Sequence, residues 1–237
     1  MALDPIDHAA LDRPIWSALT SAQRALAEGG ALAKRFPADM APFAATLDET
    51  PAAYAALGAL IPANGSVALF TPRPVLPPPS LEIERTATLF QMVASGLPPA
   101  GARDAQVLDL GEAHAGEMIG LAELTKPGPF ASRTHRLGRY IGIRVDGRLV
   151  AMAGERMRLD AYVELSAVCV HPDYRGKGYA RTLLSTLMAA APRQGLVPFL
   201  HVFDRNAGAI ALYRDMGFEV RLHAHLSVLR HAGPGPT

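Results

Sequence analysis

The sequence predicts an α/β fold, a mixed twisted sheet flanked by helices, preceded by a helical or mixed N-terminal domain. Three observations lead to this class. Strand-like and helix-like segments alternate in the second half of the chain, an Asp-Gly turn joins two of the strands, and two helical patterns each follow a strand. With 49% hydrophobic residues among 237, the chain has ample apolar material for a packed core.

Residues 1–103 are predicted to form the helical or mixed domain, whose role is unknown. Helical spacing runs through SALTSAQRALAEGGALAKRF and through DETPAAYAALGALI, where the acidic start favours a helix cap. GSVALFTPRPVLPPPS predicts one short strand followed by extended, proline-rich chain. A second cluster, SGLPPAGARD, places the main boundary near Gly101, so that the second domain covers 104–231 and a flexible tail 232–237.

The second domain supplies the sheet in the order β-α-β-β-β-α-β-α-β. AQVLDL predicts a strand and GEAHAGEMIGLAEL a helix, and Asp146-Gly147 suits a tight hairpin turn because both residues must take positive φ. AYVELSAVCV predicts the next strand. From Gly178 apolar residues recur with a helical period, VPFLHVF predicts a strand, and NAGAIALYRDMGF predicts a helix ending at Gly217. EVRLHAHLSVLR closes the order as a strand.

Composition excludes several classes of partner. Lys+Arg 23 against Asp+Glu 22 gives a net charge of +1, which provides no overall basic field for nucleic acid or anionic lipid. The single cysteine, Cys169, permits no internal disulfide and suits a reducing compartment. The N-terminus lacks the pattern of a signal peptide, and the apolar runs are too short for a membrane helix. We therefore expect a cytoplasmic protein without nucleic-acid or membrane partners.

A basic, glycine-containing stretch, RGKGYA, lies where a predicted strand leads into a helix. Free backbone N–H groups and the helix dipole favour an anion at such a point. Gly176 and Gly178 would let the main chain approach a phosphate closely. Arg175, Lys177 and Arg181 would supply positive charge. The stretch therefore predicts binding of a diphosphate.

One of three phosphate-binding motifs fits this loop. The Walker string G-x-x-x-x-G-K-[ST] does not occur, and the fingerprint G-x-G-x-x-G read from Gly176 fails at its last glycine. The acyl-CoA loop [QR]-x-x-G-x-[GA] is satisfied by Arg175, Gly178 and Ala180. In this loop and in FLHVFDRNAGAIALYRDMGF the sequence resembles the GNAT N-acyltransferase superfamily, over roughly residues 105 to 230.

The resemblance implies a GNAT-like acyltransferase fold with acetyl-CoA as co-substrate. It implies direct transfer of an acetyl group from the CoA thioester to an amine of a small molecule or peptide. Val168 and Val170 would act through their main chain, as an added strand pairs with a sheet edge. No metal is expected, because His223 and His225 have no third ligand in view. The cofactor-binding residues predicted in this way are Val168, Val170, Arg175, Gly176, Lys177, Gly178, Tyr179, Ala180, Arg181, Asn206 and Ala209.

Acetyl transfer needs a neutral amine and a route for protons, which points to acid and base residues. Glu164, on the strand before the loop, is the first candidate for the base, and the resemblance often places a carboxylate there. Glu155, on the preceding strand, is the second. A structural ion pair or an exposed position in the sheet is the alternative for Glu164. The resemblance makes Tyr213, nearly two helical turns after Asn206, the general acid near the CoA sulfur; a core aromatic is its alternative.

The sequence leaves the acceptor unspecified. The loop TKPGPFASRTHRLG carries Arg133, His135 and Arg136, which would recognise a carboxylate unless the loop is simply solvated. A non-catalytic acyl-CoA-binding sensor or scaffold is the alternative function, although the pair Glu164 and Tyr213 favours an enzyme. The sequence specifies neither the length of the acyl chain nor whether the protein forms a homodimer.

Overall fold

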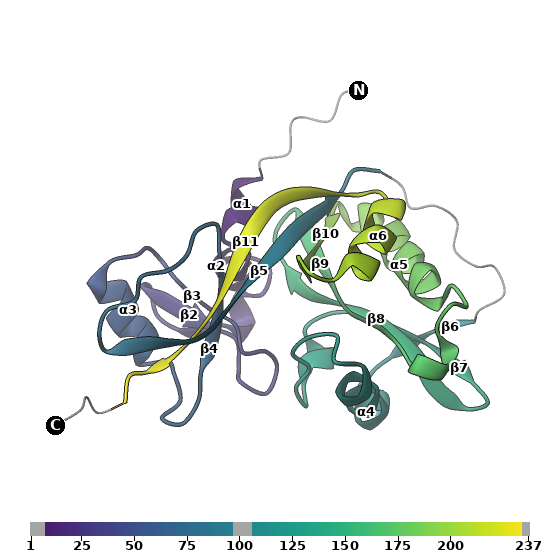
Figure 1. The fold of residues 1–237 in the computed structure, drawn as a ribbon, viewed down its shortest axis with the longest axis horizontal. Coiled ribbons are helices and arrows are strands. Elements are labelled where there is room, and N and C mark those ends of the chain that lie inside the picture. The colour runs from purple at the N-terminus through teal and green to yellow at the C-terminus, as the bar shows by residue number, and fades with distance from the viewer. Residues whose placement is uncertain (1–7, 97–105, 234–237) are drawn as a thin grey trace. The chain divides into compact units, whose positions relative to one another are not determined.

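The chain folds into two compact units in a computed structural model (Figure 1). The described residues are 8–96 and 106–233. The first unit contains the chain up to Pro37, Pro42–Thr88 and the chain from His223; the second contains Ala38–Ala41 and Leu89–Leu222. The predicted boundary between residues 103 and 104 lies outside the described residues.

The first unit combines short helices with a small sheet. Its α-helices are α1 (Ala9–Asp12), α2 (Pro14–Thr20) and α3 (Pro51–Gly58). Its strands β1 (Glu28–Gly29), β2 (Ala33–Arg35) and β3 (Ala44–Thr46) pair antiparallel in the order β1-β2-β3. The helix predicted through residues 17–36 is therefore wrong beyond Thr20, because α2 ends there and only a 3-10 turn, Arg24–Leu26, follows before β1.

The helix predicted at the second alanine-rich stretch is confirmed, although its cap differs. Thr50, in extended conformation, accepts a hydrogen bond from the N–H of Ala53 and so caps α3. Asp48 accepts the hydroxyl and the N–H of Thr50 instead of capping the helix itself. The predicted short strand is β4 (Val67–Thr71), which pairs antiparallel with β11 (Phe218–His231).

The second unit is built around the mixed sheet that the sequence predicts. β5 (Leu81–Ala94) belongs to this unit from Leu89 onward. The other strands of the unit are β6 (Val107–Leu110), β7 (Tyr140–Val145), β8 (Arg148–Arg158), β9 (Tyr162–Val170) and β10 (Val197–Phe203). The sheet has the order β4-β11-β5-β10-β9-β8-β7-β6. β9 and β10 are parallel, whereas β10 is antiparallel to β5, β9 to β8, β8 to β7 and β7 to β6. β5 was not predicted from the sequence.

Helices cover both faces of this sheet (Figure 1). They are α4 (Ala115–Thr125), α5 (Tyr179–Ala190) and α6 (Ala207–Asp215). One core cluster joins α5 and α6 to residues such as Ala151 and Leu165, and another joins α4 to residues such as Met152 and Cys169. Because neighbouring residues of a strand point to opposite faces, α4 packs on the face opposite α5 and α6.

Local turns agree with the sequence. Asp146 and Gly147 both take positive φ, 49° and 77°, in the hairpin between β7 and β8. Gly217 takes φ 86° after α6. Leu183, Leu184 and Leu187 of α5 are fully buried, as their helical spacing requires. The residues whose conformation is dictated locally were thus predicted correctly.

Candidate active site

The glycine-containing loop lies where β9 leads into α5. A single 3-10 turn at Pro172–Tyr174 follows the strand, and Gly176 and Gly178 take φ values of 76° and 77° before α5 begins at Tyr179. Other residues adopt this left-handed conformation rarely, so the two glycines let the chain curl in front of the helix. The N–H groups of the first helical turn have no partner within the helix, so they can bind an anion.

Two of the three predicted cationic side chains stand at the surface of this loop. Arg175 and Lys177 are exposed, and the Lys177 ammonium lies 4.9 Å from the centre of the Tyr174 ring. Arg181 is half-buried and donates to Asp215 at 3.3 Å, which ties α5 to the end of α6. Arg175 and Lys177 are therefore the cations most available to a phosphate.

β9 and β10 separate in front of this loop and form a fork. The two parallel strands pair over Tyr162–Glu164 and Val197–Phe199, after which β10 continues against β5 and β9 against β8. In the described part of the chain no residue of β10 pairs with Leu165–Val170. His171 donates its N–H to Val150 on β8, so alternation turns the main chain of Val170 toward the open side. An extended ligand can add there as a strand does.

A bulge in β9 shapes the fork. The register with β8 shifts between the pairs Met152↔Cys169 and Gly154↔Ser166, so β9 has one residue more than its partner. Ala167 lies in this extra segment with φ 51°, a conformation that few residues with a side chain adopt. The bulge bends β9 at the point where its edge toward β10 is open.

α6 brings Asn206, Ala209 and Tyr213 to the same region. The Asn206 side chain accepts from the N–H of Ala209 at 3.2 Å, so Asn206 caps the helix. Tyr213 is half-buried, and burial, reinforced by the nearby Cys169, raises the pKa of its phenol to about 12. Tyr213 packs against the same core cluster as Val168 and Val170 of β9. The high pKa of its phenol keeps the hydroxyl protonated at neutral pH.

Glu164 lies at the base of the fork and is fully buried. Arg156 on β8 donates to both carboxylate oxygens, at 2.6 and 2.7 Å, and His201 on β10 contacts one of them at 2.8 Å. Burial would raise the pKa of this carboxyl, but the charge and hydrogen bonds of Arg156, together with His201, lower it to about 2. Glu164 is therefore a weak proton acceptor held in a fixed position.

Glu155 has the opposite electrostatic character. Its side chain is buried, burial raises the pKa of its carboxyl, and the backbone of Arg139 opposes this shift. In the described residues its Oε1 has no hydrogen-bond partner, and neither has the buried hydroxyl of Tyr140. Burial raises the pKa of the Tyr140 phenol. Unpartnered polar atoms in this position can receive a ligand.

The arginines of the loop before β7 already have carboxylate partners. Arg136 donates to Glu112 at 2.6 Å, and His135 contacts the same carboxylate at 3.0 Å. Arg133 pairs with Asp39 at 2.9 Å. This loop therefore binds carboxylates of its own unit, which fixes its shape beside Tyr140.

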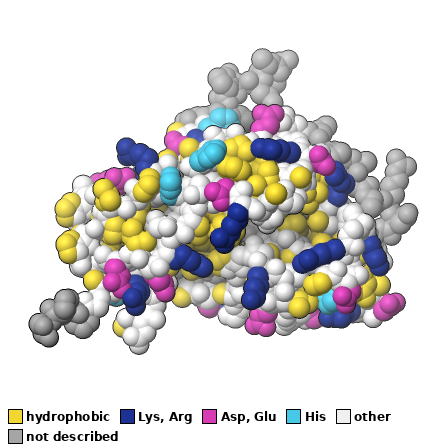
Figure 2. Space-filling view, in the orientation of Figure 1, with side chains coloured by type: hydrophobic (Ala, Val, Ile, Leu, Met, Phe, Trp, Pro, Cys, Tyr) yellow, Lys and Arg dark blue, Asp and Glu magenta, His cyan; other side chains and the backbone are white. Residues whose placement is uncertain are grey.

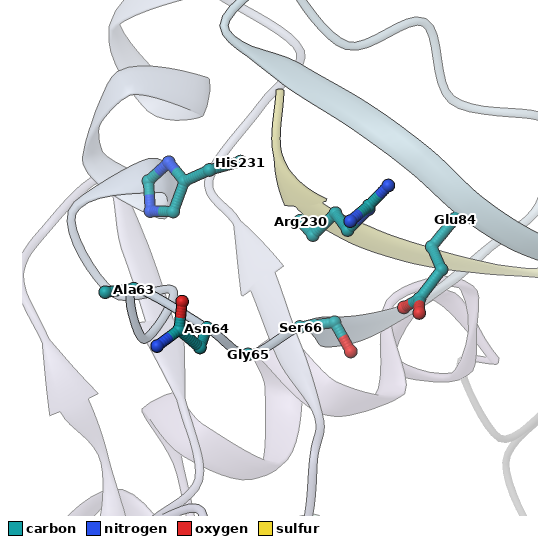
Figure 3. A pocket seen from close by; sticks show the side chains of 7 residues that line it. All are labelled: Ala63, Asn64, Gly65, Ser66, Glu84, Arg230 and His231. Atoms are coloured by element: carbon teal, nitrogen blue, oxygen red, sulfur yellow. The ribbon is translucent and has the colours of Figure 1, made fainter. Parts of the chain in front are cut away.

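The first unit has a separate polar hollow (Figure 3). Asn64, Ser66, Glu84, Arg230 and His231 contribute side chains to its lining. None of the predicted site residues is among those that line it, and Arg230 is paired with Glu82 at 2.6 Å. The hollow therefore adds nothing to the site at the fork.

Surface charge and helix length agree with the composition. Acidic side chains are interspersed among the cationic ones on the face shown in Figure 2. No helix within residues 8–96 and 106–233 is both long and apolar enough to cross a membrane. Those residues also bring together no group of three or more side chains that could hold a metal ion.

Sequence reasoning missed four residues around Glu164. Arg156, His201, Gln91 and Arg221 come from four different strands, so no local motif contains them. One signal was available: His201 interrupts the otherwise apolar VPFLHVF, and a polar residue in a buried strand needs a partner.

Comparison with known proteins agrees with this geometry. The profile of the acetyltransferase (GNAT) family matches residues 108–218. A solved GNAT-family structure from Novosphingobium aromaticivorans is 40% identical, with 94% of this chain and 99% of that chain covered and a TM-score of 0.87. A GCN5-related N-acetyltransferase from Kribbella flavida shares the fold at a TM-score of 0.63 and 16% identity, over 98% of both chains.

A curated relative extends the similarity to a named activity. The N-alpha-acetyltransferase RimI of Mycobacterium tuberculosis is 40% identical over 83 residues, which are 34% of this chain and 51% of that protein. The chain thus spans about half the length of the curated relatives it matches. The full-length structural relative and the family profile together establish the family: this chain belongs to the GNAT family of acetyltransferases.

Proposed function

We propose that this protein is an acetyl-CoA-dependent N-acetyltransferase that transfers the acetyl group directly to the α-amino group of a peptide or protein. The observation that carries the proposal is the fork between β9 and β10. It combines an open strand edge, an anion-binding loop at its end and a protonated phenol beside it. In acetyl-CoA the open strand edge fits the arm that carries the thioester, the loop fits the diphosphate, and the phenol fits the departing thiolate.

The loop would hold the diphosphate and the fork the pantetheine arm. Phosphate oxygens would accept from the N–H groups around Gly176 to Ala180, with Arg175 and Lys177 at the surface as counter-charges. The main chain of Val168 and Val170 would bond the arm, and one of these N–H groups would polarise the thioester carbonyl. Asn206, Ala209, Tyr179 and Arg181 complete the proposed cofactor site.

An α-amino acceptor is supported by the named activity of the relative and by energetics. An α-amine with a pKa near 7.8 needs about 1 kcal/mol to become neutral at pH 7, whereas a lysine-like amine needs about 4.6 kcal/mol. The smaller free energy needed to neutralise an α-amine suits a site whose acidic groups are buried carboxylates. A peptide is the smallest acceptor that carries such an amine in its natural setting.

Glu155 has the more suitable pKa of the two predicted bases. A base is most effective when its pKa lies near the working pH, and burial moves the pKa of Glu155 in that direction. The pKa of Glu164 is moved away from it. We therefore assign proton acceptance to Glu155 and a positioning role to Glu164.

Tyr213 would protonate the departing group. The amine nitrogen attacks the thioester carbon, the C–S bond breaks, the amine proton passes to the base, and the phenol proton of Tyr213 passes to the CoA sulfur. Because the phenol has a pKa of about 12, it is fully protonated before the step. The CoA thiol has a pKa near 8.5, so its thiolate needs a proton donor only in the transition state, while the C–S bond breaks.

Calorimetric titration with acetyl-CoA tests the first half of the proposal. The wild type should bind saturably, and Arg175→Ala/Gly178→Asp should lose binding because a charge is removed and a repulsive one is added at the loop. Arg193→Ala, an exposed arginine outside the loop, is the matched control. Equal binding by the wild type and the double variant would refute the loop as the diphosphate site.

Thiol release tests the second half. A peptide with a free α-amine should stimulate release of CoA, whereas the same peptide with an acetylated N-terminus and an internal lysine should not. Stimulation by lysine alone would contradict the α-amine assignment. Binding of acetyl-CoA without stimulation by any amine would support a sensor or scaffold instead of an enzyme.

A further inference from the structure

A row of polar side chains, buried except for the half-buried Arg221, crosses five strands of the sheet at the base of the fork. Arg221 on β11 donates to Gln91 Oε1 on β5 at 2.8 Å, and Gln91 Nε2 lies 3.2 Å from His201 Nε2 on β10. His201 Nδ1 lies 2.8 Å from Glu164, to which Arg156 donates from the other side. The side chains of His201 and Glu164 are 2% and 0% exposed.

The chemistry of these groups fixes where each proton lies. Arginine can only donate, so the atom of Gln91 that faces Arg221 is its carbonyl oxygen, and the amide nitrogen faces His201. The amide nitrogen can only donate, so Nε2 of His201 must accept. The proton of the neutral imidazole is therefore on Nδ1, where it is donated to the Glu164 carboxylate.

The row thus transmits the orientation of one arginine to a carboxylate three strands away. Arg221 helps to orient the Gln91 amide, because an arginine can only donate and therefore selects the amide oxygen. A turned amide would present oxygen to His201 Nε2, which would then need a proton. Nδ1 would keep its proton, because the Glu164 carboxylate that it faces can only accept, so the ring would become a cation beside Glu164.

We propose that Gln91 and Arg221 are positioning residues for acyl transfer, because they hold His201 in the Nδ1–H tautomer and so fix the ionised Glu164 at the base of the fork. The inference rests on the function proposed above. Glu164 is the last residue of β9 that pairs with β10, so its bonds to His201 and Arg156 join β8, β9 and β10 where the thioester arm would enter.

The sharpest variant is Gln91→Glu, which keeps the shape of the side chain. Both carboxylate oxygens accept, so Arg221 keeps its partner while His201 Nε2 faces an acceptor and must carry a proton. Nitrogen NMR of labelled full-length protein at pH 7 should show unequal ring nitrogens for His201 in the wild type, with the proton on Nδ1. In Gln91→Glu the two nitrogens should become nearly equivalent, as in a doubly protonated ring.

Kinetics then separate positioning from folding. We expect Gln91→Glu and Arg221→Met to lower kcat with the α-amine peptide by at least about tenfold. Their Kd for acetyl-CoA should stay within about threefold of the wild type, because neither side chain belongs to the loop that holds the diphosphate. Arg193→Met is the matched control, since this exposed arginine lies outside the row, and it should change neither the NMR spectrum nor kcat.

Three results would overturn the inference. The first is a proton on Nε2 of His201 in the wild type, and the second is an unchanged His201 spectrum in Gln91→Glu. The third is an unchanged kcat in both variants. If the wild type failed to bind acetyl-CoA, the proposed function and the positioning role would both fall, whereas the NMR result would still show whether the row sets the tautomer.

Discussion

At the scale of single residues, burial gives the side chains around the fork different proton affinities. Burial raises the pKa values of the Tyr213 phenol and the Glu155 carboxyl, whereas Arg156 overrides burial at Glu164. Burial also raises the pKa of the Cys169 thiol, to about 11. A thiol with that pKa is almost entirely protonated at pH 7, which argues against Cys169 as an acyl carrier.

Removing the Tyr213 hydroxyl should affect the chemical step alone. We expect Tyr213→Phe to lower kcat by about 100-fold, a typical contribution of a general acid, because the thiolate would leave unprotonated. Acetyl-CoA affinity measured by calorimetry should stay near that of the wild type. Tyr54→Phe removes a phenol from α3 in the first unit and serves as the control. An unchanged kcat in Tyr213→Phe would eliminate this residue as the acid.

The pH dependence of kcat should identify the base. Glu155 accepts a proton only as a carboxylate, and its raised pKa means that this form is lost at a higher pH than for an ordinary glutamate. The wild-type rate should therefore fall as the pH falls through that raised value. Glu155→Gln should be slower and lack this acid limb, whereas Glu123→Gln, on the exposed face of α4, should keep it. An acid limb that survives in Glu155→Gln would exclude Glu155 as the base.

At the scale of elements, the ion pair between Arg156 and Glu164 joins β8 to β9 inside the sheet. Glu164→Gln would leave Arg156 buried without its counter-charge, which costs about 3 to 5 kcal/mol. The folded pKa of Glu164, about 2, lies below its unfolded value, so its contribution is present above about pH 4.5 and is lost as the pH falls toward 2.

Chemical denaturation at several pH values measures this contribution. The difference in unfolding free energy between the wild type and Glu164→Gln should be largest near pH 7 and should shrink below pH 4. The double variant Arg156→Met/Glu164→Leu should cost less than the sum of its single changes, because it leaves no buried charge unpaired. A difference that stays constant with pH would contradict the lowered pKa.

The bulge in β9 should control access of the pantetheine arm. Ala167→Val places a β-branched residue at φ 51°, where it is strongly disfavoured, so β9 should straighten and the open edge should be lost. We expect the Kd for acetyl-CoA to rise by at least about tenfold, which corresponds to about 1.4 kcal/mol. Ala167→Gly is the matched control, since glycine adopts this conformation readily and should retain binding. Equal affinities in the two variants would show that the bulge does not shape the site.

At the scale of the whole molecule, the elements that were predicted are those whose signals are local. The hairpin turn at Asp146 and Gly147 could be predicted from the backbone angles that these two residues adopt, and α5 could be predicted from the spacing of its leucines. β5 was missed because prolines and charged residues precede its apolar half. The polar row at Glu164 was missed because the topology of the sheet, not the order of the sequence, brings Gln91, His201 and Arg221 together.

The topology also predicts the behaviour of a fragment that begins at residue 104. Such a fragment, 104–231, contains the predicted second domain but lacks β5, so Phe199–Phe203 of β10 would lose the antiparallel partner that pairs with all five residues. Gln91 would be lost as well, so His201 would lose its hydrogen bond to this residue. An unpaired apolar strand in this position exposes backbone groups that the fold normally satisfies.

We therefore expect fragment 104–231 to lack a cooperative thermal transition and to bind no acetyl-CoA, whereas the full chain should show both. Circular dichroism melting and calorimetry on the same samples measure the two properties. A second fragment, 81–231, restores β5 and should recover at least part of the cooperative transition. If 104–231 folded and bound acetyl-CoA like the full chain, β5 would be dispensable for the site. Recovery in 81–231 but not in 104–231 would instead assign to β5 a direct part in completing the sheet that holds the fork.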